Sequence, residues 1–150
     1  MLDQIVFLPF DGPIPPLPED GKSDGLQAAR SQLRVLVVDD EPLIAQTVTA
    51  ILNGHGFEAM ESTSAEDALE IARSFQPDIV LSDVLMPRMN GVDLGVRLRG
   101  EFPHTRILLF SGQAATSELM RKAEEKGYHF ELFPKPIHPD ELIARLRGLV

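Results

Sequence analysis

Five polar side chains in this sequence stand at or just after the ends of short apolar stretches. They are Asp39, Asp40, Asp83, Ser111 and Lys135. If those stretches are parallel strands of one sheet, their carboxyl ends meet along a single edge, which is where open α/β sheets bind ligands. The sequence therefore predicts a site that contains three carboxylates, a hydroxyl and an ammonium group.

The chemistry of such a site follows from its charges. Carboxylates held within a few ångströms repel one another, so either one is protonated or a cation lies among them. Carboxylate oxygens suit Mg²⁺, which takes only one or two protein carboxylates and keeps several waters. A carboxylate can also accept a phosphoryl group as a nucleophile, while Lys135 and Ser111 can bind phosphoryl oxygens. These residue types favour Mg²⁺-dependent phosphoryl transfer to an aspartate.

Each residue also has a simpler interpretation. Asp39 and Asp40 could cap the helix that follows them, and Asp83 could be an ordinary loop acid. Ser111 could open a turn, and Lys135 could be a solvated surface lysine. All of these would have to hold together at one edge of one sheet, so a functional site is the better explanation.

The elements that would position these residues begin at Leu33, where apolar segments start to alternate with amphipathic ones. The predicted strands are residues 33–38, 57–62, 79–82, 106–110 and 130–133, and the predicted helices are residues 42–53, 64–75, 92–102, 117–126 and a last one from Pro139. This alternation is typical of βαβ units, and it predicts a five-stranded parallel α/β sheet with five helices on its two faces.

Residues 1–32 have a different composition. Five prolines fall between Pro9 and Pro18 among acidic residues and glycines, which favours extended or turn conformations. We expect a flexible proline-rich N-terminal arm over residues 1–32 and one folded domain over residues 33–150. The arm is either a plain linker or a ligand for an aromatic groove.

Composition narrows the classes of partner. The chain has 150 residues, 43% of them hydrophobic, a formal net charge of −9 and no cysteine. The acidity argues against nucleic acid and anionic membrane surfaces, both of which attract basic patches. No apolar run reaches the roughly 20 residues that span a bilayer, and the lack of cysteine suits a reducing compartment. We therefore expect a cytoplasmic protein without a nucleic-acid or membrane partner.

The same residues, in the same order, resemble the receiver domain of bacterial response regulators in two-component signalling. The matching segments are residues 35–42, 77–87, 90–91, 108–112 and 135–136, and the resemblance covers about residues 33–150. It implies a flavodoxin-like, doubly wound sheet with the strand order 2-1-3-4-5.

The resemblance also implies a metal site. Asp83 would be the phosphoacceptor and a Mg²⁺ ligand, and Asp40 would bind the ion directly. Asp39 would act mainly through water, and the backbone carbonyl of Leu85 would complete the protein ligands.

The remaining implied roles concern the phosphoryl group. Ser111 would hydrogen-bond to it and move on activation, and Lys135 would pair with it, next to a cis bond to Pro136. The family usually has an aromatic switch residue three positions before the lysine, where this sequence has Leu132. The sequence therefore departs from the family's usual coupling of hydroxyl and aromatic ring, while phosphorylation is still expected.

The leading hypothesis is a stand-alone receiver, because the sequence ends at Val150 directly after the last predicted helix. It would take a phosphoryl group from a histidine kinase or a phosphotransfer protein and signal by binding a protein effector, catalysing only its own phosphorylation and dephosphorylation. One alternative is an interaction module that works without phosphorylation. A less favoured one is a Mg²⁺-dependent aspartyl phosphatase, because Leu85 stands where such enzymes place a second acid.

Overall fold

A computed structural model describes residues 32–112 and 116–149. The predicted N-terminal arm lies outside the described residues except for Gln32, so its boundary remains a prediction.

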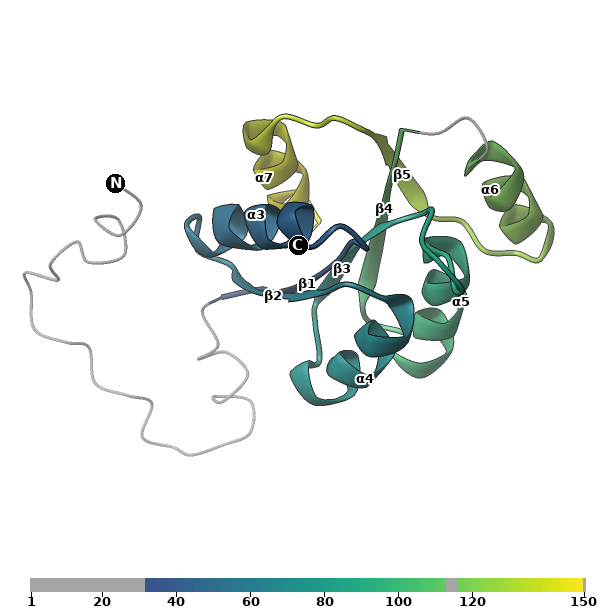
Figure 1. Cartoon of the computed structure of the whole chain (residues 1–150). Coiled ribbons are helices and arrows are strands. Elements are labelled where there is room, and N and C mark those ends of the chain that lie inside the picture. Colours follow the sequence, from purple (N-terminus) through teal and green to yellow (C-terminus); the bar gives the residue numbers. More distant parts are fainter. Residues whose placement is uncertain (1–31, 113–115, 150) are drawn as a thin grey trace, which may run out of the picture.

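The described chain alternates strands and helices as the sequence predicts (Figure 1). The strands are β1 (Arg34–Val38), β2 (Glu58–Ser62), β3 (Ile79–Asp83), β4 (Arg106–Ser111) and β5 (Glu131–Pro134). The helices are α3 (Pro42–Asn53), α4 (Ala65–Phe75), α5 (Gly91–Glu101), α6 (Thr116–Glu125) and α7 (Pro139–Arg147). Most predicted ends agree within one residue, and each of these helices and strands had been predicted.

All five strands are parallel, in the order β2-β1-β3-β4-β5. This confirms the doubly wound flavodoxin-like fold. Helices α3 and α7 pack on one face of the sheet, and α4, α5 and α6 pack on the other (Figure 1). Since every strand runs in the same direction, the residues that follow β1, β3, β4 and β5 come to one edge of the sheet.

The strands supply a core on each face because successive side chains of a strand point to opposite sides. In β1, Leu36 and Val38 face α4 and α5, whereas Val35 and Val37 face α3 and α7. All four are at most 3% exposed. Such double burial explains why the inner strands are apolar almost throughout, and it makes the sheet a rigid frame for its polar edge.

Local sequence signals fix the helix starts. Pro42 occupies the first turn of α3, and the Ser64 side chain accepts a hydrogen bond from the backbone N–H of Asp67 at the start of α4. Asn90, predicted as part of a turn, instead caps α5 by accepting from the N–H of Asp93 at 2.8 Å. The prediction of a turn at Asn90 was wrong. Asparagine favours turns and helix N-caps for the same reason, because its side-chain oxygen accepts a hydrogen bond from a nearby backbone N–H.

The glycine at position 95 inside α5 has a packing reason. A side-chain carbon at Gly95 would lie 2.9 Å from the ring of Phe130, so only glycine lets the ring lie against the helix. Phe130 is buried and precedes β5. The low helix propensity of this glycine is therefore offset by the contact that it permits.

Candidate functional site

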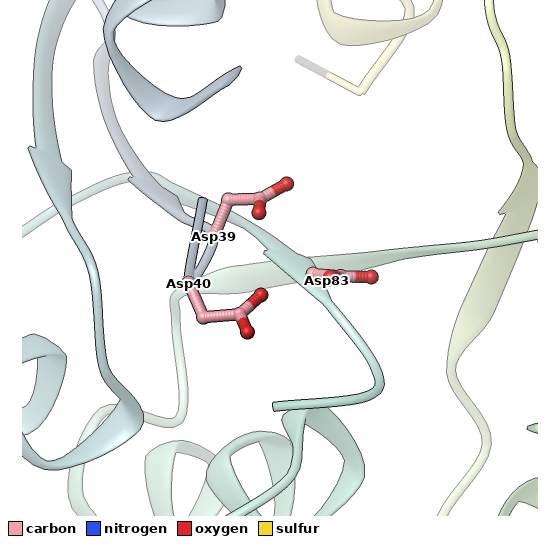
Figure 2. Close-up of side chains that lie close together, drawn as sticks. All are labelled: Asp39, Asp40 and Asp83. Carbon is pink, nitrogen blue, oxygen red and sulfur yellow. The ribbon is translucent and has the colours of Figure 1, made fainter. Parts of the chain in front are cut away.

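Three carboxylates meet at the carboxyl edge of the two central strands. Asp39 and Asp40 directly follow β1, and Asp83 is the last residue of β3. One oxygen from each of the three lies within 4.8 Å of the others (Figure 2). Because β1 and β3 are paired in register, with Val38 beside Ser82, the sheet itself determines this proximity.

A lysine that follows the edge strand β5 reaches the carboxylates. The Lys135 ammonium lies 3.3 Å from Asp39 Oδ2 and 3.4 Å from Asp83 Oδ1. The bond between Lys135 and Pro136 is cis, as the resemblance implies. The side chain is 30% exposed, so the simpler interpretation of Lys135 as a freely solvated surface lysine does not describe it.

The simpler interpretation of the acid pair also differs from what the structure shows. The residue that caps α3 is Glu41, and no side chain makes a capping hydrogen bond there. Asp39 accepts one hydrogen bond from the backbone N–H of Glu41 at 3.0 Å through Oδ1. Its other oxygen faces Lys135, and Asp39 as a whole is only 4% exposed.

Burial and mutual charge perturb two groups of the cluster. Burial is the largest influence on Asp83 and raises the pKa of its carboxyl, Lys135 opposes this, and the Asp39 charge raises the pKa further. Burial opposes the charge on Lys135, but attraction to Asp83 and Asp39 outweighs it, so the pKa of the ammonium is raised. The site therefore holds an excess of negative charge that one lysine does not neutralise.

The hydroxyl predicted for this edge has a partner that sequence analysis missed. Ser111 ends β4, and its hydroxyl hydrogen-bonds to the hydroxyl of Thr116, the first residue of α6. Both residues are buried, and Thr116 is only 1% exposed. The available signal was a hydroxyl residue five positions after Ser111, just before the predicted helix, but nothing in the spacing said that it would turn back toward the strand.

The backbone beside Asp83 requires a glycine. A side-chain carbon at Gly91 would lie 2.1 Å from the backbone oxygen of Asp83, well inside van der Waals contact. The N–H of Gly91 donates to the carbonyl of Val84 at 2.7 Å. The start of α5 is thus held directly against the end of β3, which fixes the backbone that carries Asp83.

The two leucines singled out in the sequence lie on the surface. Leu85, two residues after Asp83, is 37% exposed, and Leu132 on the edge strand β5 is 39% exposed. Leu132 presents neither a ring nor a hydroxyl to Ser111. The predicted roles of the Leu85 carbonyl and of position 132 remain predictions.

The donor set fits a hard divalent cation. Three carboxylates with only one compensating ammonium form an oxygen-rich cluster of excess negative charge, as Mg²⁺ sites do. Asp39, Asp40 and Asp83 are the described residues whose oxygens converge closely enough to share one ion.

Comparisons with known proteins agree with this fold and site. Residues 35–147 match the sequence model of the family described as the response regulator receiver domain. The chain is 34% identical over 115 residues to the DNA-binding response regulator MtrA of Mycolicibacterium smegmatis, covering 77% of this chain and 49% of that protein. The chain thus spans about half the length of the curated relatives that it matches.

Solved structures share the architecture. A CheY-like receiver domain from Methanospirillum hungatei aligns with a TM-score of 0.72 over 79% of this chain and 94% of its own, at 24% identity. The response regulator TrrA of Thermotoga maritima, solved in complex with Mg²⁺ and BeF, aligns with a TM-score of 0.68 and 27% identity over 79% of this chain and all of its own. Among the residues that the structure describes, no helix has the length and apolar character to cross a membrane.

Proposed function

We propose, on the premise that this chain belongs to the response regulator receiver domain family, that it is phosphorylated on Asp83 as its signalling event. The observation that carries the proposal is the convergence of Asp39, Asp40 and Asp83 within 4.8 Å, with the Lys135 ammonium against two of them. An ordinary loop acid would not be expected to lie against two further carboxylates and a lysine.

In the proposed transfer, an oxygen of the Asp83 carboxylate forms a bond to phosphorus. The bond from phosphorus to a histidine nitrogen of the donor breaks, and its electron pair leaves with the imidazole. Asp83 must be ionised to attack, and the Lys135 ammonium at 3.4 Å favours that form. The same ammonium is placed to bind an oxygen of the transferred group. Most of the catalysis is therefore positioning and charge stabilisation.

The metal would be held by Asp40 and Asp83, with Asp39 close by and the backbone of Leu85 as a further ligand. When bound, Mg²⁺ supplies positive charge that offsets the repulsion between the carboxylates and the incoming phosphoryl oxygens.

Ser111 is the group proposed to respond to the new phosphate. Its hydroxyl is bonded to Thr116 at the start of α6. A phosphoryl group on Asp83 offers a charged acceptor, which makes a stronger hydrogen bond than a neutral hydroxyl does. If Ser111 turns toward it, the contact with Thr116 breaks and α6 loses an anchor, which is a shift between two populations of conformers.

We further propose that the domain acts alone and passes its signal to a protein effector, with a histidine kinase or phosphotransfer protein as donor. The exposed Leu132 on β5 offers an apolar contact for an effector. The half of MtrA that this chain does not match leaves the stand-alone arrangement open to test. An antibody against the domain would decide it, because the native protein in cell extract migrates either near the 16.6 kDa of this chain or at about twice that mass.

A second candidate is an interaction module that needs no phosphorylation. The absence of an aromatic ring at Leu132 favours it, because the usual partner of the switch hydroxyl is missing. Nothing in the described site favours the phosphatase alternative, since the exposed Leu85 side chain offers no acid.

The deciding experiment is intact mass spectrometry after incubation with acetyl phosphate, with and without Mg²⁺. The wild type is expected to gain one phosphoryl group only with Mg²⁺, and Asp83→Asn is expected to gain none. Asp67→Asn is the matched control, because Asp67 is an exposed acid on α4 that does not belong to the cluster. An adduct that persists in Asp83→Asn contradicts the assignment. If no adduct forms, the next test is binding of beryllium fluoride. Binding would mean that the phosphoryl group is lost by rapid hydrolysis, and no binding would favour the interaction module that is never phosphorylated.

A further inference from the structure

Helices α5 and α6 lie on the sheet face that α3 and α7 do not cover (Figure 1). A groove with a cationic lining runs between them. Its volume is about 560 Å³. The charged residues on its walls are four cations and two acids: Arg88, Arg97, Lys122, Lys126, Glu66 and Asp93. The chain has a formal net charge of −9, whereas the lining of this groove carries more positive than negative side chains.

Three of the cations form no ion pair within the described residues, although Lys122 adds to the effect of Arg121 in lowering the pKa of the Glu118 carboxyl. Arg88 faces Glu66, with Nε 3.7 Å from its carboxylate. Arg97, Lys122 and Lys126 make no ion pair and no side-chain hydrogen bond with any residue in the ranges 32–112 and 116–149. Arg121, next to Lys122, is paired with two glutamates of its own helix. The groove therefore holds positive charge that is available to a ligand.

The floor of the groove is apolar. Met89, Val96 and Leu119 are partly buried and rest on the core beneath them. An occupant that fits would bring apolar side chains for this floor and acidic groups for the walls. That combination excludes a simple inorganic anion as the best match.

The chain itself carries such a segment. Residues 1–20 contain four acids, at positions 3, 11, 19 and 20, and no lysine or arginine. Between the first two acids lies the stretch Ile5–Phe10, which has no charged residue and includes two phenylalanines. We propose that residues 1–20 bind in the groove between α5 and α6, with Ile5–Phe10 on its floor and Asp3 and Asp11 against the unpaired cations.

The connection is long enough for this contact. Residues 11–32 join the apolar stretch to the start of β1 and can span up to about 70 Å when extended. A domain of this size has a radius of gyration of about 14 Å, so the groove is within reach. Tethering also raises the effective concentration to the millimolar range, so a weak contact is enough.

Charge selects this groove over the other apolar one. A smaller pocket of about 240 Å³ lies between α3 and α7, with Ile44, Val48 and Leu142 in its lining. It is bordered by both Asp39 and Lys135, but Asp40 and Asp83 lie close by, so the three carboxylates outnumber the one ammonium. An acidic segment is repelled there, whereas the groove between α5 and α6 attracts it.

The contact has a consequence for α6. This helix begins at Thr116, whose hydroxyl is bonded to Ser111, and its Leu119 and Lys122 line the groove. A segment bound along α6 would hold the helix in the position described here. The binding proposal itself does not depend on phosphorylation of Asp83.

The test is paramagnetic relaxation in the full chain, which has no native cysteine. A nitroxide on Gln4→Cys is expected to reduce the amide signals of Val96, Leu119 and Lys122. The loss should disappear in a triple variant with Arg97→Glu, Lys122→Glu and Lys126→Glu. It should also weaken in 1 M salt, where the Debye length falls to about 3 Å.

The matched control is Arg106→Glu at the start of β4, an exposed cation outside the groove, which should leave the signal loss unchanged. A second variant, Asp3→Lys with Asp11→Lys, removes the charge match from the arm side and leaves the folded domain untouched. Signal loss that is spread evenly over the surface, is centred on α3 and α7, or survives both charge reversals overturns the proposal. So does a loss seen only between labelled and unlabelled molecules in a mixed sample, since the contact would then join two chains.

Discussion

Removing the Asp83 charge should stabilise the metal-free protein. At an effective dielectric constant of about 20, unit charges 4.8 Å apart repel by about 3.5 kcal/mol, and charges 3.4 Å apart attract by about 5 kcal/mol. Oxygens of Asp39 and Asp40 lie within 4.8 Å of an Asp83 oxygen, and the Lys135 ammonium lies 3.4 Å from Asp83. The two repulsions exceed the attraction by about 2 kcal/mol, and burial, the largest influence on the Asp83 carboxyl, opposes its charge as well. We expect Asp83→Asn to raise the free energy of unfolding by about 1–2 kcal/mol at pH 7 with EDTA.

Mg²⁺ should reverse that order. A ligand that binds only the folded state at one hundred times its Kd stabilises it by about 2.7 kcal/mol. The wild type should gain about this amount, and Asp83→Asn should gain little because it lacks a ligand. Urea unfolding followed by circular dichroism, with EDTA or with Mg²⁺, measures both differences, and Asp67→Asn serves as the control that should follow the wild type.

The pH dependence has a definite sign. The pKa of Asp83 is raised in the folded state by burial and by Asp39, so the folded protein binds a proton more readily than the unfolded chain does. The wild type therefore loses stability relative to Asp83→Asn as pH rises from the ordinary aspartate value of about 4 through the raised pKa. The advantage of the variant should vanish below about pH 4, where Asp83 is protonated in both states. An equal difference at every pH, or a variant less stable than the wild type in EDTA, refutes this account of the cluster.

Three further perturbations test the groups around the carboxylates. Gly91→Ala should cost about 1–3 kcal/mol and reduce the phosphoryl adduct, because the new methyl group meets the Asp83 carbonyl; urea unfolding and intact mass measure the two effects. Thr116→Val should cost about 1 kcal/mol for the lost hydrogen bond and raise the steady-state adduct, because Ser111 no longer has to leave that partner; a lowered adduct contradicts the switch. Lys135→Gln should bind Mg²⁺ more tightly in calorimetry, since the ammonium no longer competes for Asp83, while the adduct yield falls; unchanged metal affinity contradicts that competition.

The fold could be predicted from the sequence because its signals are local and repeated. Each inner strand is a short apolar run, and several helices carry their own start signal, such as Pro42 or Ser64. The alternation favours parallel strands, and a parallel sheet brings Asp39, Asp40 and Asp83 to one edge. Their convergence within that edge depends on the pairing of β1 with β3. The strand order, by contrast, came from the family resemblance, because apolar periodicity does not say which strand lies beside which.

The contacts that the sequence did not reveal depend on the approach of two backbones. Thr116 reaches Ser111 because of the path between β4 and α6, and the need for glycine at position 91 arises because α5 begins against the end of β3. Neither helix and strand propensities nor the spacing of residues in the sequence can predict these distances. The Asn90-Gly91 pair shows the limit clearly, since it predicts a turn, whereas in the structure one residue caps a helix and the other allows a close backbone contact.

The same distinction separates the two charged features of the surface. The acid cluster is made by strand ends, so its members are marked in the sequence by the apolar runs that precede them. The cationic groove is made by side chains of α4, α5 and α6 and of the segments beside them. In the sequence, Arg97, Lys122 and Lys126 look like ordinary solvated helix positions. Only the packing of α5 against α6 shows that three cations with no ion pair in the described part of the chain share one groove. A charge surplus of this kind is visible only after folding, and this surplus is the reason why we propose the groove as the binding place of the acidic first twenty residues.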